Sequence, residues 1–246
     1  MTPQPAPATG APPRQITMHV FRGDADGGEF REYTVPFEEG LVVLDVIHRI
    51  QGIHANDLAV RWNCKAGKCG SCSAEVNGQP RLMCMTRMEI FPEGEPITVA
   101  PLKAFPLIKD LVTDVSFNYE AARQIPAFRP RPPDPDGTYR MMQEDIDRGQ
   151  EFRKCIECFL CQDVCHVIRD HDDNKPAFAG PRIFVRLAAL EMHPLDSHSR
   201  LELLKHQAGL GLQGLGLFVD RFEHRAIHHG QADKLLSHSG PALQPR

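Results

Sequence analysis

The sequence predicts an α+β protein in which a small mixed segment of strands and one helix precedes a mainly helical segment. The first segment is indicated by apolar and polar residues that alternate around turn-forming residues, and the second by apolar residues at helical spacing. Between them lies the proline-rich stretch Pro126–Gly137, where helix is excluded and the backbone is stiff and extended. A chain of 246 residues is long enough for two small domains of this kind.

The mixed segment contains two predicted hairpins and one helix. The stretch Gly23–Gly28, rich in Asp and Gly, joins the first two strands. Asn77-Gly78 joins the next two, because type I′ turns need positive φ at both central residues. Apolar residues on one face of Leu41–Ile50 predict a short amphipathic helix. The predicted strands are Gln15–Phe21, Glu29–Val35, Ala74–Val76, Arg81–Met85 and Ile97–Ala100.

Helical spacing dominates the second half of the chain. It predicts helices over Phe105–Tyr119 and Pro181–Glu191, and from Met141 it continues through the cysteine-rich residues that follow. We therefore expect four parts, which are a disordered tail at residues 1–14, the mixed domain at 15–104, a linker with the proline-rich strap at 105–140, and a helical domain at 141–246.

Composition narrows the classes of function. The net charge of −4 argues against nucleic-acid binding, and no apolar run is long enough to predict a transmembrane helix. The N-terminal residues lack the apolar core of a secretory signal, so we expect a reducing compartment. In such a compartment, eight cysteines indicate metal ligands rather than disulfides.

The first four cysteines form the set Cys64-x4-Cys69-x2-Cys72-x11-Cys84, which is the spacing of plant-type [2Fe–2S] sites. Three thiolates from one tight loop can wrap a flattened two-iron core. The fourth follows the predicted Asn77-Gly78 turn, so the hairpin returns it to the loop.

Small and flexible residues accompany this loop. Gly67 and Gly70 let the backbone adopt positive φ and approach a bound cluster closely. Methionines fill irregular gaps in protein cores, so three of them are expected to pack around the cluster. These are Met83, Met85 and Met88.

The second set is Cys155-x2-Cys158-x2-Cys161-x3-Cys165, the spacing of bacterial-type [4Fe–4S] sites. Three cysteines spaced three apart can cap one face of the cube. The fourth cysteine in such runs ligates a different cluster. The proline that usually follows it is replaced here by His166.

Zinc is the main alternative, because zinc sites also use Cys-x2-Cys pairs. Zinc sites generally separate two such pairs by a dozen or more residues, and three cysteines in one short run suit a single tetrahedral ion poorly. Buried structural thiols or disulfides are a further alternative. No phosphate loop, dinucleotide fingerprint or Ser-His-Asp order is present, so the sequence predicts no catalytic constellation.

The motifs RWNCKAGKCGSCSAEVNGQPRLMCMT and EFRKCIECFLCQDVC resemble the iron–sulfur subunit of succinate dehydrogenase/fumarate reductase, in its actinobacterial form, over Gln15–Asp196. The resemblance implies an N-terminal β-grasp [2Fe–2S] ferredoxin domain and an α-helical ferredoxin domain. It also implies electron transfer between the flavin of an FAD-containing flavoprotein subunit and quinone at a membrane anchor. Such a subunit binds no nucleic acid and lies peripherally on the cytoplasmic face of the bacterial cell membrane, held by its partners.

The resemblance also implies a ligand role for each cysteine. The first set holds [2Fe–2S], and Cys155, Cys158 and Cys161 hold three corners of [4Fe–4S]. Cys165 belongs to a third cluster, [3Fe–4S], or serves here as the fourth cubane ligand. In the family, a later cysteine group completes the last two clusters. It would begin near residues 209–211, yet no cysteine follows Cys165.

Two explanations of this missing group stay open. The reading frame is altered from about Leu212, or the chain is a natural variant that uses another ligand. Two other functions also stay open, namely a free-standing two-cluster ferredoxin and a zinc-binding interaction module. The strap and the long segments without cysteines argue against a simple ferredoxin, which does not need them.

Overall fold

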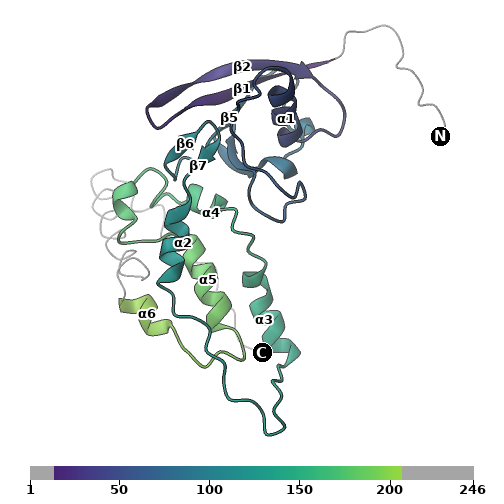
Figure 1. Ribbon diagram of the computed structural model, residues 1–246. Coiled ribbons are helices and arrows are strands. Elements are labelled where there is room, and N and C mark those ends of the chain that lie inside the picture. The colour runs from purple at the N-terminus through teal and green to yellow at the C-terminus, as the bar shows by residue number, and fades with distance from the viewer. Residues whose placement is uncertain (1–13, 207–246) are drawn as a thin grey trace, which may run out of the picture. The chain divides into compact units, whose positions relative to one another are not determined.

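The computed structural model describes residues 14–206, which form two compact units (Figure 1). The first unit contains the chain up to Ser116 together with Cys155–Val164. The second contains Phe117–Lys154 and the described residues from Cys165 onward. The limits of these compact units differ from the predicted domains at 15–104 and 141–246. The domain boundaries themselves remain a prediction. The predicted N-terminal tail before Arg14 and the chain from residue 207, including Leu212, lie outside the described residues.

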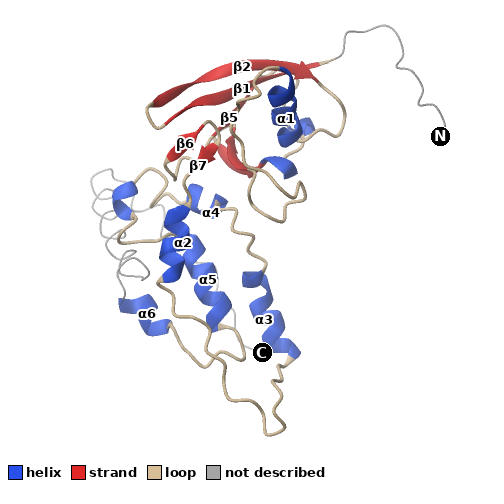
Figure 2. Ribbon diagram, viewed as in Figure 1, coloured by secondary structure: helices blue, strands red, loops and turns tan. Residues whose placement is uncertain are grey.

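A mixed sheet of seven strands forms the first unit (Figure 2). Its order is β4-β3-β5-β1-β6-β7, with β2 paired to β1. Strands β1 and β5 run parallel, and the other pairs are antiparallel. The strands are β1 (Gln15–Asp24), β2 (Gly27–Pro36), β3 (Ser73–Val76), β4 (Gln79–Leu82), β5 (Ile97–Ala100), β6 (Leu107–Lys109) and β7 (Val112–Thr113).

Both predicted hairpins are present, but the predicted strand Arg81–Met85 is wrong at its end, because β4 stops at Leu82 and Met83–Met85 form a 3-10 helix. Asn77 and Gly78 have φ of 50° and 71°, as a type I′ turn requires. The first hairpin is longer than predicted, because Gly23 and Gly28 pair across it instead of forming a loop. A Cβ on Gly23 would lie 2.3 Å from the carbonyl oxygen of Gly27, so glycine allows the strands to stay close up to the turn.

Helix α1 (Val43–Ile53) packs on the sheet and supplies much of the apolar core of the first unit (Figure 2). Its buried face includes Leu44, Ile47 and Ile50, which cluster with Met18 and Val20 of β1. It begins two residues later than predicted. The Asp45 carboxylate accepts the backbone N–H of the residue before the helix at 3.2 Å and so caps its first turn.

The predicted helix over Phe105–Tyr119 is wrong. The chain instead forms the short strands β6 and β7, and helix α2 begins only at Ser116. Asp110 turns the chain between the strands with a φ of 51°. Its buried carboxylate accepts hydrogen bonds from the backbone N–H groups of Gly23 at 3.0 Å and Ala59 at 2.8 Å. These partners lie far away in sequence, so tertiary contacts override the local helical spacing.

We expect Asp110→Ala to destabilise the first unit strongly. The Asp110 carboxylate also accepts a hydrogen bond from Nε of the buried Arg22 at 3.0 Å. Removing the carboxylate takes one partner from a buried guanidinium and leaves two backbone N–H groups without an acceptor. The free energy of unfolding should fall by about 3 kcal/mol. Urea unfolding measures the loss, with Asp26→Ala in the exposed turn as the control. Equal stability of the two variants would contradict this role.

Helices form the second unit. Helix α5 lies beside α2 and also contacts α3 (Figure 1). The prediction of Pro181–Glu191 as a helix is confirmed, with proline in its first turn, where no N–H is needed. The remaining α-helices are α2 (Ser116–Arg123), α3 (Gln143–Arg153), α4 (Leu160–Asp163, in the first unit) and α6 (Leu201–His206). The 3-10 helices are η1 (Met83–Met85), η2 (Met88–Ile90) and η3 (Asp172–Asn174).

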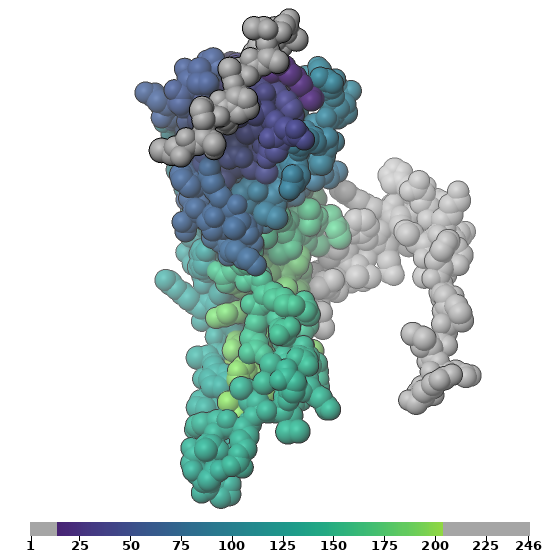
Figure 3. Space-filling model, turned by 90° about the vertical axis from the view of Figure 1, so that its right-hand side faces the viewer, coloured from purple at the N-terminus to yellow at the C-terminus, as the bar shows by residue number. Residues whose placement is uncertain are grey.

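The proline-rich strap is not helical, as predicted, and it protrudes from the second unit (Figure 3). Its start is held by Arg200, which is 1% exposed. The Arg200 guanidinium donates to the carbonyl oxygens of Pro126 and Ala127 at 2.9 and 2.8 Å, and it pairs with the Asp196 carboxylate at 2.9 Å. In residues 14–206, no helix has the length and hydrophobicity of a membrane span.

Candidate metal centres

The first cysteine loop lies between α1 and β3 in the first unit. Cys64 and Cys69 are partly exposed, whereas Cys72 and Cys84 are buried. The hairpin returns Cys84 to the loop as expected, on η1 directly after β4. The backbone N–H of Cys84 donates to Sγ of Cys72 at 3.4 Å. Residues separated by two strands and a turn are thus brought into contact.

The backbone of the loop curls around Cys64. The N–H groups of Ala66 and Lys68 donate to Cys64 Sγ at 3.4 and 3.2 Å. Gly67 and Gly70 have φ of 64° and 69°, which confirms the left-handed backbone expected at both glycines. These two N–H groups already point at the sulfur, where they can hydrogen bond to a metal-bound thiolate.

The four thiols lie near one another. Cys64 influences the pKa of Cys69, and both Cys84 and Cys69 influence the pKa of Cys72. The Ser71 hydroxyl, helped by backbone N–H groups, lowers the pKa of Cys69 to about 6. Burial raises the pKa of Cys72 to about 12. Cys69 therefore offers a ready thiolate, whereas Cys72 must lose its proton when metal binds.

Four thiols on a loop and on the returning arm of a hairpin can serve a two-iron core. Each iron of a [2Fe–2S] rhomb takes two protein thiolates, whereas structural zinc needs four ligands around one point.

Two of the three methionines pack as predicted. Met83 and Met88 are buried in the core of the first unit. Met85 is 60% exposed, so its prediction as a core residue is wrong. It lies on the outer side of η1, and a Cβ on Gly67 would come within 3.0 Å of its sulfur. Met85 covers the cysteine loop instead of filling the core.

The second cysteine set interrupts the helical pattern. The expected helix through it is wrong, because α3 ends at Arg153 and α4 covers only Leu160–Asp163. Between them Glu157 and Phe159 adopt positive φ of 56° and 60°. Such a backbone costs an ordinary residue free energy and persists only where surrounding contacts impose it.

The cysteines of this second set differ in exposure. Cys155 is exposed, and Cys158 and Cys161 are partly exposed. Burial raises the pKa of Cys161 to about 11. All three belong to the first unit, whereas Cys165 belongs to the second. There Cys165 is buried in an apolar cluster with Val167, Ile168 and Phe178.

Two functional residues escaped prediction from the sequence. Ser71 donates its hydroxyl to Cys69, and Ser73 lies between the two cysteine sets. Both belong to the run Cys69-Gly70-Ser71-Cys72-Ser73, in which short hydroxyl residues alternate with ligands. That alternation is a usable signal, since second-shell donors tune metal-bound thiolates.

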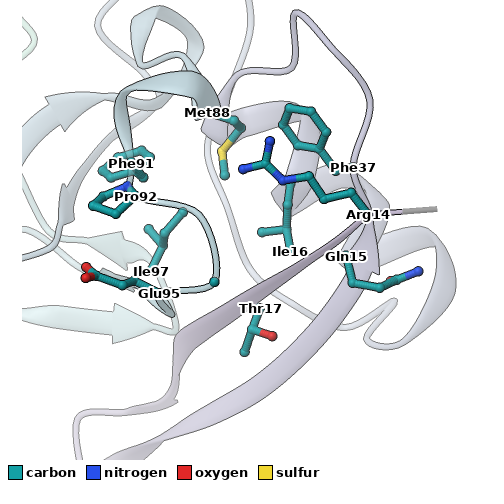
Figure 4. A pocket seen from close by; sticks show the side chains of 11 residues that line it. Arg14, Gln15, Ile16, Thr17, Phe37, Met88, Phe91, Pro92, Glu95 and Ile97 are labelled. Atoms are coloured by element: carbon teal, nitrogen blue, oxygen red, sulfur yellow. The ribbon is translucent and has the colours of Figure 1, made fainter. Parts of the chain in front are cut away.

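A pocket in the first unit is lined by residues outside both cysteine sets (Figure 4). Its lining mixes apolar side chains with the Arg14 guanidinium, which lies 4.2 Å from the centre of the Phe37 ring. No cysteine lines it, so it belongs to neither candidate centre. The other lining residues are Gln15, Ile16, Thr17, Met88, Phe91, Pro92, Gly94, Glu95 and Ile97.

Comparison with known proteins agrees with this geometry. Residues 16–120 match the family model described as a 2Fe-2S iron-sulfur cluster binding domain. The fumarate reductase iron-sulfur subunit of Mycobacterium tuberculosis is 33% identical over 76% of this chain and 74% of the relative. The succinate dehydrogenase iron-sulfur subunit of Bacillus subtilis is 28% identical over 80% and 81%.

A solved structure shows the same relationship. A chain of the Mycobacterium smegmatis Sdh1 complex in the apo form is 62% identical, with a TM-score of 0.77 over 80% of this chain and 83% of that one. The expected α+β ferredoxin-like fold and the expected family are both confirmed. The chain belongs to the family of iron–sulfur subunits of succinate dehydrogenase/fumarate reductase, which are parts of oxidoreductase complexes.

Proposed function

We propose that this chain carries electrons between a flavin and quinone, with Cys64, Cys69, Cys72 and Cys84 holding a [2Fe–2S] cluster. The observation that carries this proposal is the return of Cys84 to the loop of the other three cysteines, where its backbone N–H donates to Cys72 Sγ, together with the backbone donors aimed at Cys64. When bound, iron–sulfur clusters supply single-electron carriers whose potentials depend on nearby hydrogen bonds and solvent. The chain provides these hydrogen bonds and the partial burial.

The second cluster is assigned to Cys155, Cys158 and Cys161, as three corners of [4Fe–4S]. Their common membership in the first unit supports this assignment. Cys165 lies in the other unit, which supports its family role as a ligand of [3Fe–4S]. With no later cysteine in the 246 residues, that third cluster lacks its remaining ligands, and the cubane binds with an open iron or recruits Cys165.

The partners follow from the family. The first is an FAD-containing flavoprotein subunit that carries the dicarboxylate chemistry, so this chain is an electron-transfer subunit without a catalytic site. The second is a membrane anchor with quinone. The proposed location is peripheral, on the cytoplasmic face of the bacterial cell membrane. The Mycobacterium smegmatis relative, a chain of an Sdh1 complex, supports such an assembly.

Co-expression with a flavoprotein subunit of the same kind tests this function. We expect a brown complex that contains flavin, iron and acid-labile sulfide and that reduces a dye with succinate. Cys64→Ala with Cys84→Ala, one residue from the loop and one from η1, serves as the cluster-deficient comparison. A colourless protein that contains zinc would favour the interaction module. A brown protein that never co-purifies with the flavoprotein would favour a free-standing ferredoxin.

A further inference from the structure

Inside the first unit, the second cysteine set contacts the loop of the first set. A Cβ on Gly70 would lie 2.6 Å from Cα of Cys158, 2.8 Å from its backbone nitrogen and 2.9 Å from the carbonyl oxygen of Ile156. Real Cβ atoms do not approach backbone this closely. Only a glycine at position 70 lets the two segments touch.

A side-chain hydrogen bond joins the same two segments. Ser73 Oγ lies 2.8 Å from the carbonyl oxygen of Cys158 and 2.9 Å from that of Gly70. Its single hydroxyl proton is donated to one of these oxygens or shared between them. Ser73 begins strand β3, whose pairing with β4 and β5 makes it a rigid point of attachment.

Two further contacts hold the segment at its other end. The buried Asp163 carboxylate accepts the backbone N–H of Ala104 at 2.8 Å. Phe159 packs edge-on against Phe105, with ring centres 6.0 Å apart, in a small apolar cluster with Leu102. These contacts attach the segment after Cys158. The distance between Cys158 and the first cysteine loop is therefore set by Gly70 and Ser73.

We propose that Gly70 and Ser73 are positioning residues that set the distance for electron transfer between the two cluster sites. This inference rests on the proposed function, because it needs both clusters. Each one-electron transfer oxidises the cluster that donates and reduces the one that accepts, so no further reactant is required. The rate of electron transfer depends on the distance between the clusters. Gly70 and Ser73 hold the backbone of Cys158 against the Cys69–Cys72 loop and so set that distance.

Electron paramagnetic resonance of the full, reconstituted chain reduced with dithionite measures the gap directly. In the wild type, the second reduced cluster speeds the relaxation of the [2Fe–2S] signal. Cys158→Ala, which removes the neighbouring cluster, defines relaxation without it. We expect Gly70→Ala to lose the enhancement at unchanged iron content, because the added methyl pushes the segments apart. Ser73→Ala should lose part of it, and Ser73→Thr should restore it.

Gly78→Ala is the matched control. Its φ of 71° is close to the 69° of Gly70, so alanine strains the backbone similarly at both positions. A Cβ on Gly78 meets nothing within 4 Å, so the relaxation enhancement should survive in this variant. If Gly70→Ala prevents cluster assembly, Ser73→Ala and its threonine rescue decide the question. Wild-type chains without two clusters would refute the proposed function. Two clusters whose interaction is absent in the wild type, or survives in both alanine variants, would refute only the positioning role.

Discussion

Quinone reduction by succinate is expected to be very low in any complex built with this 246-residue chain. The family pattern of three clusters needs four, four and three thiolates, about eleven in all. The chain has eight cysteines, enough for two clusters, and none after Cys165. Histidine ligates iron–sulfur clusters in pairs on one iron, and no spacing of the histidines reproduces the missing cysteine group.

Two assays and an iron count test this prediction. Succinate should still reduce a dye that accepts electrons near the flavin, while quinone reduction is lost. Iron should not exceed about six atoms per chain, two in the first cluster and four in the second. About nine irons per chain, or normal quinone reduction, would contradict the prediction. Restoring a cysteine group near residue 212 should then recover both the iron and the quinone activity.

Cys69→Ala is expected to abolish the [2Fe–2S] cluster. One iron would lose a thiolate, and the other two cysteines of this loop, Cys64 and Cys72, already belong to the same proposed ligand set. Structural metal sites depend on the full ligand set. The helical second unit should stay folded, because its apolar core is built from α2 and α5 and includes no residue of this loop.

The measurement combines iron analysis, electron paramagnetic resonance and circular dichroism. Iron should fall by about two atoms per chain, with the rhombic [2Fe–2S] signal absent and helical content retained. Asp26→Ala, in the exposed turn of the first hairpin, is the control. A retained signal would refute Cys69 as a ligand. Loss of helical content in the variant would instead show that the second unit depends on this cluster.

Local rules were sufficient where a residue's own chemistry decides its conformation. Asn77-Gly78 forms its turn because both residues tolerate positive φ, and Pro181 starts α5 because it needs no hydrogen-bond partner there. The cysteine spacings identified the family because ligand geometry leaves few ways to wrap a cluster.

The sequence by itself therefore determined the fold class, the family and the candidate ligands, whereas the tertiary structure decided how distant segments meet. Asp110 turns the chain at a position where local spacing predicts helix, because its buried carboxylate binds backbone N–H groups far away in sequence. The backbone around Cys158 is not helical, because α3 ends before it and α4 begins after it. Gly70 and Ser73 contact this backbone. Such contacts join residues almost ninety positions apart, which no local periodicity encodes, and only the folded chain brings them within hydrogen-bonding distance.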